Sequence, residues 1–155
     1  MTLPEQERER FCQVLHHSRT SLYRLAFSIT RNSSDAQEAV AEAVCRAYER
    51  YPQLREKEKL PRWLLKITAN EARRLCQRRG RTVSLDDLPT EPAIPGRETG
   101  DDTLWQAVQT LPRDQREAVV LFYYEDLPTE EIARIVGTSP GAVRVRLSRA
   151  REKLR

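Results

Sequence analysis

Residues 80–102 are too rich in proline and glycine to continue a helix or a strand, and they divide the chain into two parts. Pro89, Pro92, Pro95, Gly96 and Gly100 all lie in this stretch, where proline removes a backbone donor and glycine favours turns. Hydrophobic residues on both sides recur at helical spacing, and each side is large enough for one very small domain. We therefore predict an all-α protein with two small helical domains, residues 1–79 and 103–155, joined by a flexible linker over residues 80–102.

Two helices are predicted early in the first domain. Leu22, Leu25 and Ile29 give residues 21–31 a helical stripe. Ser34 followed by Gln37 fits a capping box, so the second helix should begin there and end before Pro52. Its apolar face comprises Ala36, Val40, Ala43, Val44, Ala47, Tyr48 and Tyr51. The opposite face carries Gln37, Glu38, Glu42, Cys45 and Glu49, and it is either a solvated surface or an acidic docking surface.

A third helix is predicted over residues 61–79, because Pro61 suits a first helical turn. Its expected buried residues are Trp63, Leu64, Ile67 and Leu75. The helix is strongly basic, since Glu71 is its one acid against Arg62, Lys66, Arg73, Arg74, Arg78 and Arg79. The segment after it is acidic, with Asp86, Asp87, Glu91, Glu98, Asp101 and Asp102 against Arg81 and Arg97. Solubility alone does not require this segregation of charge.

A helix-turn-helix pattern dominates the second domain. Leu104, Val108 and Leu111 give it a short first stripe, and Pro112 opens a helix whose aromatic residues, with Trp105, are expected in the core. Thr129 is the expected cap of the next helix, with Ile132, Ala133 and Val136 buried. Gly137 supplies a left-handed turn, and Ser139 and Pro140 start the last helix. Two short helices joined in this way form a DNA-binding unit.

The last helix is the predicted recognition helix. Val143, Leu147, Ala150 and Leu154 share one face, so Val145, Ser148 and Arg149 should point away from the core. Arg144, Arg146 and Arg151 should lie on the two flanks. Outward residues can contact base edges, while flanking arginines can hold phosphates. A basic solvated helix at the end of a bundle is the simpler alternative, but the caps, the glycine turn and the apolar register favour DNA binding.

Other classes of protein find little support in the sequence. No run approaches the roughly 18 apolar residues of a membrane span, and residues 1–11 lack the apolar core of a signal peptide. We therefore predict a cytoplasmic protein without membrane insertion. Cys12 and His16 are spaced for one helix face, but two ligands do not make a closed metal site. No phosphate loop or nucleophile elbow is present, so we predict neither a cofactor nor an enzyme.

Three segments resemble extracytoplasmic-function sigma factors of bacterial RNA polymerase. LYRLAFSITRNSSDAQEAVAEAVCRAYERY is similar to the core-binding segment of that family, and WLLKITANEARRLCQRR to its promoter-melting segment, with Trp63 and Asn70 at family positions. Residues 111–155 resemble its promoter-reading domain. The resemblance implies core RNA polymerase and promoter DNA as partners, and commonly an anti-sigma factor. It implies core binding by Gln37, Glu38, Glu42 and Cys45, minus-10 handling by Lys66, Asn70, Arg73 and Arg74, and minus-35 binding by Arg144, Val145, Arg146, Ser148, Arg149 and Arg151.

Two departures from the family pattern bear on function. The core-binding helix reads DAQEAVAE where the family usually reads closer to DAEDLVQE, which bears on affinity for core polymerase. Val145 stands where a small polar residue is common, and it could touch a thymine methyl group. A helix-turn-helix regulator with an N-terminal dimerisation or sensing domain is the alternative function. The acidic helix, loop and basic helix between residues 34 and 79 suit promoter melting better than sensing.

Overall fold

The computed structural model describes residues 3–79 and 102–155. Regular structure in these ranges is helical, without a strand, as the sequence predicts. The predicted linker lies outside the described residues except for Asp102, where a helix begins. The elements, in order, are α1 (Glu5–Thr30), α2 (Ser33–Arg50), η1 (Tyr51–Gln53), η2 (Lys57–Lys59), α3 (Leu60–Arg79), α4 (Asp102–Gln109), α5 (Arg113–Val119), η4 (Val120–Tyr124), α6 (Thr129–Val136) and α7 (Pro140–Leu154).

The helix predicted at residues 21–31 is in fact much longer, because α1 already begins at Glu5. Glu5 and Glu7 place negative charge in its first turn, where the helix dipole favours it. Phe11 is buried against the rings of Tyr48 and Tyr51, with centroids 5.4 Å and 5.3 Å away. This contact anchors the first turns of α1, and it joins residues too far apart in the chain for periodicity to reveal.

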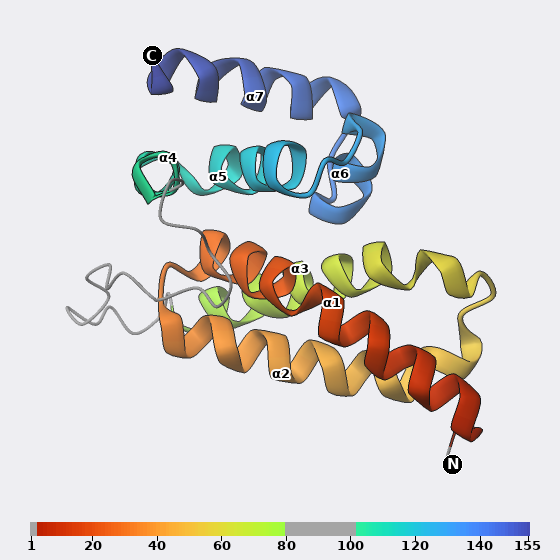
Figure 1. The fold of residues 1–155 in the computed structure, drawn as a ribbon. Helices are drawn as coiled ribbons and strands as arrows, with labels where there is room; N and C mark the ends of the chain where they lie inside the picture. The colour runs from red at the N-terminus through yellow and green to blue at the C-terminus, as the bar shows by residue number, and fades with distance from the viewer. Residues whose placement is uncertain (1–2, 80–101) are drawn as a thin grey trace.

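The cap predicted at Ser34 is wrong, because α2 begins one residue earlier and is capped by Asn32. The Asn32 side chain accepts a hydrogen bond from the Asp35 amide at 2.9 Å, which satisfies one of the first amides of the helix. On the predicted apolar face, Ala36, Ala43, Ala47 and Tyr51 are fully buried, whereas Val40, Val44 and Tyr48 are half-buried. Ala39, which we did not place on this face, is also fully buried. Small side chains allow close packing, and α1, α2 and α3 contact one another as one bundle (Figure 1).

In the C-terminal half, one aliphatic and one aromatic residue that we expected to be buried are exposed. Trp105, Val108 and Leu111 are buried as predicted, but Leu104 is 49% exposed. Tyr123, which we expected in the core, is 52% exposed. It lies in the π-helical turn η4, where the amide of Glu125 donates to the carbonyl of Val120 at 3.1 Å. This wider turn changes the helical register, so Tyr123 faces solvent.

The two halves pack against each other, which the sequence did not predict. Helix α1 contacts α5 and η4, and α3 contacts α6. Phe27 of α1 lies beside Trp105 of α4, with ring centroids 6.3 Å apart. In Figure 1, α5 lies between the α1–α3 bundle and α7, so α7 forms the outer layer. Within the described part of the chain, no helix has both the length and the apolar content that a bilayer crossing requires.

Candidate nucleic-acid and polymerase interfaces

Helices α6 and α7 form the predicted helix-turn-helix. Gly137 adopts a left-handed conformation with φ 77°, and its amide donates to the carbonyl of Ala133 at 2.9 Å. A side chain at this φ would be strained, so glycine ends α6 at low cost. Ser139 caps α7 by accepting a hydrogen bond from the Ala142 amide at 3.1 Å. The cap predicted at Thr129 is wrong, because Thr129 is already helical and Pro128 holds the cap position without a side-chain bond.

The register of α7 matches the sequence prediction. Val143, Leu147 and Ala150 are buried, and Leu154 is half-buried. In α6, Ile132 and Ala133 are buried as predicted, but Ile135 is buried in place of Val136, which is half-buried. The other side of α7 exposes Arg144, Val145, Ser148 and Arg149, and Val145 is 48% exposed. Helix α7, which carries these four side chains, forms the outer layer of the molecule (Figure 1).

Arg146 and Arg151 are held at the flanks of α7 by residues of α5 and η4. Arg146 Nε lies 3.8 Å from a carboxylate oxygen of Asp114. Arg151 Nε donates to the hydroxyl of Tyr123 at 2.6 Å, and its guanidinium lies 5.8 Å and 5.7 Å from the ring centroids of Phe122 and Tyr123. Arg151 remains exposed and Arg146 is half-buried, so both arginines lie beside the face that carries Arg149.

The predicted minus-10 residues of α3 do not form one cluster. Lys66, Asn70 and Arg74 are exposed, whereas Arg73 is half-buried in an ion pair with Glu117 of α5 at 2.6 Å. At about 100° per residue, Arg73 and Lys66 lie within about 20° of each other, while Arg74 lies about 100° from Arg73. Arg74 accordingly faces the groove between α2 and α3. Trp63, which we expected to be buried, is only half-buried.

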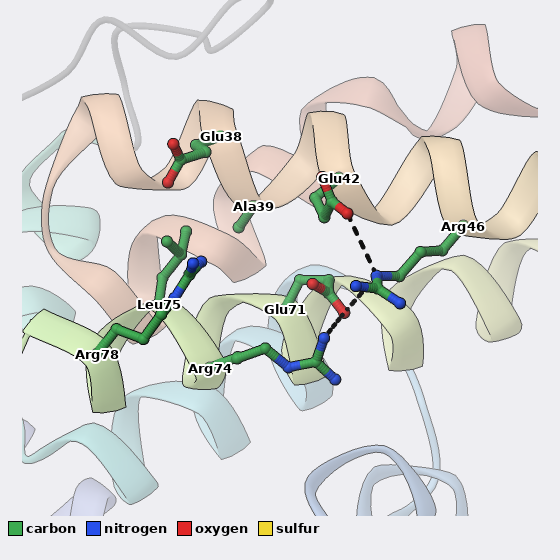
Figure 2. Close-up of a pocket in the computed structure, with 8 residues that line it drawn as sticks. All are labelled: Glu38, Ala39, Glu42, Arg46, Glu71, Arg74, Leu75 and Arg78. Atoms are coloured by element: carbon green, nitrogen blue, oxygen red, sulfur yellow. Dashed lines mark ion pairs between the residues drawn. The ribbon is translucent and has the colours of Figure 1, made fainter.

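A charged groove of about 410 Å³ separates α2 and α3. Figure 2 shows the residues that line it: Glu38, Ala39, Glu42, Arg46, Glu71, Arg74, Leu75 and Arg78. The buried carboxylate of Glu71 is 3.1 Å from Arg46 and 3.4 Å from Arg74. Arg46 also lies 3.5 Å from Glu42. The pair of Arg46 with Glu71 joins α2 to α3, whereas the other two pairs each lie within one helix. Sequence reasoning missed this role of Glu71; its signal was a lone acid in a basic helix.

The predicted polymerase-binding residues lie together on α2. Gln37, Glu38, Glu42 and Cys45 are all exposed. Glu38, Glu42 and Cys45 follow one another at helical spacing along a single stripe, and Gln37 lies beside it. The stripe forms one wall of the charged groove through Glu38 and Glu42.

Two titratable groups have shifted pKa values near the contact between the halves. Burial lowers the pKa of Arg116 to about 10, and repulsion by Arg31 and Arg113 adds to this effect. Burial also raises the pKa of the half-buried Cys76 thiol above 9.0, whereas Cys12 and Cys45 are exposed. In the part of the chain that the structure describes, no three His, Cys, Asp or Glu side chains are grouped to hold a metal ion.

Comparison with known proteins identifies both halves. The family described as Sigma-70 region 2 matches residues 14–82, and the family described as Sigma-70, region 4 matches residues 101–154. RNA polymerase sigma factor SigV of Bacillus subtilis is 33% identical over 86% of this chain and 81% of its own length. ECF RNA polymerase sigma factor SigE of Mycolicibacterium smegmatis is 31% identical over 86% of this chain and 56% of its own length.

A solved structure has the same arrangement of helices. The sigma factor RpoE from Bartonella quintana, crystallised with the anti-sigma factor NepR, superposes with a TM-score of 0.77. It is 26% identical in sequence, and the match covers 97% of this chain and 95% of that one. The two sigma regions therefore occur here in the order and in the fold of their relatives, and the chain belongs to the bacterial RNA polymerase sigma factors of the extracytoplasmic-function type.

Proposed function

We propose that this chain binds core RNA polymerase and directs it to promoters through three separate surfaces, one on each of α2, α3 and α7. The proposed domains are residues 1–79, which bind core and handle the minus-10 element, and residues 103–155, which bind the minus-35 element, with residues 80–102 as the linker. The observation that carries this proposal is the exposed basic face of α7, set in a capped helix-turn-helix. The chain acts as a binding subunit in the cytoplasm, where polymerase and DNA are, and not as an enzyme.

The minus-35 surface is the exposed side of α7. Val145, Ser148 and Arg149 face away from the protein core, so their side chains are free to approach base edges in a major groove. Arg144, Arg146 and Arg151 bind phosphates on either side. The contacts of Arg146 with Asp114 and of Arg151 with Tyr123 support this division, because they direct both guanidinium groups to the flanks of the helix.

The minus-10 surface comprises Lys66, Asn70, Arg73 and Arg74 of α3, together with residues 53–60, which we predicted as a loop and which include the short helix η2. Opened DNA exposes bases that a loop can capture, while cations track the phosphate backbone. The exposure of Lys66 and Asn70 beside Arg73 supports this assignment. Replacing Asn70 and Arg73 with alanine should reduce open-complex formation on duplex DNA, and a premelted template should partly restore it. Equal loss on both templates would instead indicate a general loss of binding.

The core-binding surface is the stripe of Gln37, Glu38, Glu42 and Cys45 on α2. Its exposure, opposite a face of buried alanines, supports this proposal. Reversing the charges of Glu38 and Glu42 should weaken association with core and leave the binding of duplex DNA unchanged. Unchanged affinity for core would contradict the assignment. Since the matched Bartonella sigma factor was crystallised with an anti-sigma factor, we propose that an anti-sigma factor also regulates this chain.

Run-off transcription tests the proposed function directly. The chain, added to core polymerase on a promoter library, should yield transcripts from a defined subset of promoters, and core polymerase alone should not. A helix-turn-helix regulator with a sensing domain would bind DNA in the same assay without programming core polymerase. Absence of transcripts together with absence of co-purification with core would overturn the proposal.

A further inference from the structure

Tyr123 is exposed although the sequence pattern places it in the core. Among the residues that the structure describes, three large hydrophobic side chains are exposed, and Tyr123 has the largest exposed fraction, 52%. It lies in the π-helical turn η4, and isolated π-helical turns recur at functional sites. Because a buried tyrosine ring would contribute to core packing, its outward position indicates a role other than stabilising the fold.

The Tyr123 side chain contacts α7 through one arginine. The Nε of Arg151 donates a hydrogen bond to the Tyr123 hydroxyl at 2.6 Å. The same guanidinium lies 5.7 Å from the ring centroid of Tyr123 and 5.8 Å from that of Phe122, within the range of a cation–π interaction. An exposed arginine has many rotamers open to it, but here a hydrogen bond and two rings hold the guanidinium in one orientation.

This contact leaves free the groups that bind a phosphate. An arginine has five N–H donors, and Tyr123 accepts from the one on Nε. Within the described part of the chain, no hydrogen bond occupies the two terminal nitrogens of Arg151. A guanidinium can bind a phosphate through two parallel hydrogen bonds. The Tyr123 hydroxyl acts as an acceptor toward Arg151, so its own hydrogen can be donated to a phosphate oxygen.

The position of Arg151 on α7 places it beside the DNA backbone. At about 100° per residue, Arg151 lies about 160° from Arg149 but within about 20° of Arg144. At about 1.5 Å per residue, Arg144 and Arg151 are separated by about 10 Å along the helix axis. The two arginines therefore form a row along one flank of α7. Such a row faces the phosphates when the helix lies in a major groove.

We propose that Tyr123 and Arg151 together form a site for one phosphate of the duplex minus-35 DNA. Tyr123 holds the guanidinium in place and donates its hydroxyl hydrogen to the same phosphate. The proposal rests on the proposed binding of minus-35 DNA by α7, and it adds to that interface a residue from outside the helix-turn-helix. Because the ligand is a phosphodiester, the site contributes affinity without sequence preference. Fixing the guanidinium before DNA binds lowers the entropy lost on binding.

Methylphosphonate substitution tests the site one phosphate at a time, because it removes the charge of a single phosphate. The affinity of holoenzyme is measured for a promoter duplex identified by run-off transcription, and for duplexes that each carry one methylphosphonate in the minus-35 element. The test variants are Tyr123→Phe, which removes only the hydroxyl, and Arg151→Ala. One control is Tyr124→Phe, at a ring that packs against Trp105 of α4 with centroids 5.5 Å apart. The other is Arg144→Ala, on the same flank of α7.

Tyr123→Phe should weaken binding of the unmodified duplex by about two- to fivefold, and Tyr124→Phe should match the wild type. Arg151→Ala should weaken binding further and reduce the salt slope by about one. One methylphosphonate should weaken the wild type, have a smaller effect on Tyr123→Phe and have none on Arg151→Ala. Tyr123→Phe should lose most of its effect in the Arg151→Ala background and keep it in the Arg144→Ala background.

Equal effects of Tyr123→Phe in both arginine backgrounds would overturn the proposal, as would a methylphosphonate profile that neither test variant changes. Denaturation monitored by circular dichroism checks the fold, and the stability of Tyr123→Phe should match that of the wild type because the side chain is exposed. The Arg151→Ala profile tests the phosphate contact independently of any change at Tyr123. Absence of promoter-specific transcripts from the wild type would overturn the proposed function itself, whereas transcripts with unchanged profiles would overturn only this site.

Discussion

Helices α3 and α7 are both arginine-rich, yet the fold gives their arginines different partners. On α3, Arg62 and Arg73 pair with glutamates of the C-terminal half, and Arg74 pairs with the buried Glu71. On α7, Arg144 and Arg149 are exposed. The difference shows that the net charge of a helix predicts its affinity for nucleic acid only when its tertiary partners are also known.

The ion pairs of the two helices also differ in how much they contribute to the stability of the fold. The pair between Arg73 and Glu117 is short and its acid is almost fully buried, so either partner alone would leave a poorly solvated charge. The pair between Arg146 and Asp114 is longer, and its acid is 54% exposed. Exposed pairs of that kind contribute about 0–1 kcal/mol. Arg73 therefore contributes to stability, whereas Arg146 can leave its partner for DNA at little cost to stability.

The largest expected change in stability comes from a substitution that weakens the packing of α7 and leaves α3 unchanged. Leu147→Ala empties a buried position on the core face of α7 and should lower the free energy of unfolding by about 2–5 kcal/mol. Chemical denaturation monitored by circular dichroism measures this change. Val145→Ala, at an exposed position of the same helix, is the control and should have little effect. Equal stability of both variants would show that α7 does not pack as described.

Removing one arginine from each helix sharpens the comparison. Arg73→Ala leaves the carboxylate of Glu117 buried without its 2.6 Å partner and should lower the free energy of unfolding by about 1–3 kcal/mol. Arg149→Ala should change it by less than about 0.5 kcal/mol, because that side chain is exposed. Thermal or denaturant unfolding of the two variants measures both changes in the free energy of unfolding. A larger loss for Arg149→Ala would reverse the roles assigned to the two helices.

Within α7, the exposed and the flanking arginines should differ in specificity. A bidentate contact of Arg149 with guanine would provide about 1–3 kcal/mol of discrimination, so Arg149→Ala should relax preference at one or two minus-35 positions. Arg146→Ala should weaken binding to all sequences alike and reduce the salt slope by about one. The base preference and the affinity of both variants are measured in holoenzyme on a promoter library. If the two variants exchange these effects, the rotation of α7 on DNA is wrong.

The smallest expected effect concerns the thiols. Burial raises the pKa of Cys76 on α3, so less thiolate is present near neutral pH and alkylation should be slower than at the exposed Cys45. Because the thiolate reacts, the rate at Cys76 should level off at a higher pH than the rate of an unshifted thiol. Mass spectrometry of alkylated peptides over a pH series measures both rates. Faster alkylation of Cys76 than of Cys45 at pH 7 would contradict its burial.

Local interactions were predictable from the sequence because their partners lie within one or two helical turns. The turn at Gly137, the cap at Ser139 and the buried register of Val143, Leu147 and Ala150 all follow from residues close together in the chain. The cap of α2 was predicted two residues too late, at Ser34 in place of Asn32, because both residue types are good caps. The exposure of Tyr123 was missed because a π-helical turn changes the register without a clear sequence signal.

The sequence by itself determined the helical class, the division into two helical halves, and the stripes of exposed residues on α2 and α7. Only the tertiary structure decided which cations are paired within the protein and which are available to DNA. Arg73 and Glu117, for example, are 44 positions apart, and no local pattern links them. The same holds for Phe11 with Tyr51 and for Arg24 with Glu125. Periodicity predicts which side of a helix is buried, but the identity of the group that meets a given charge depends on the packing of distant helices.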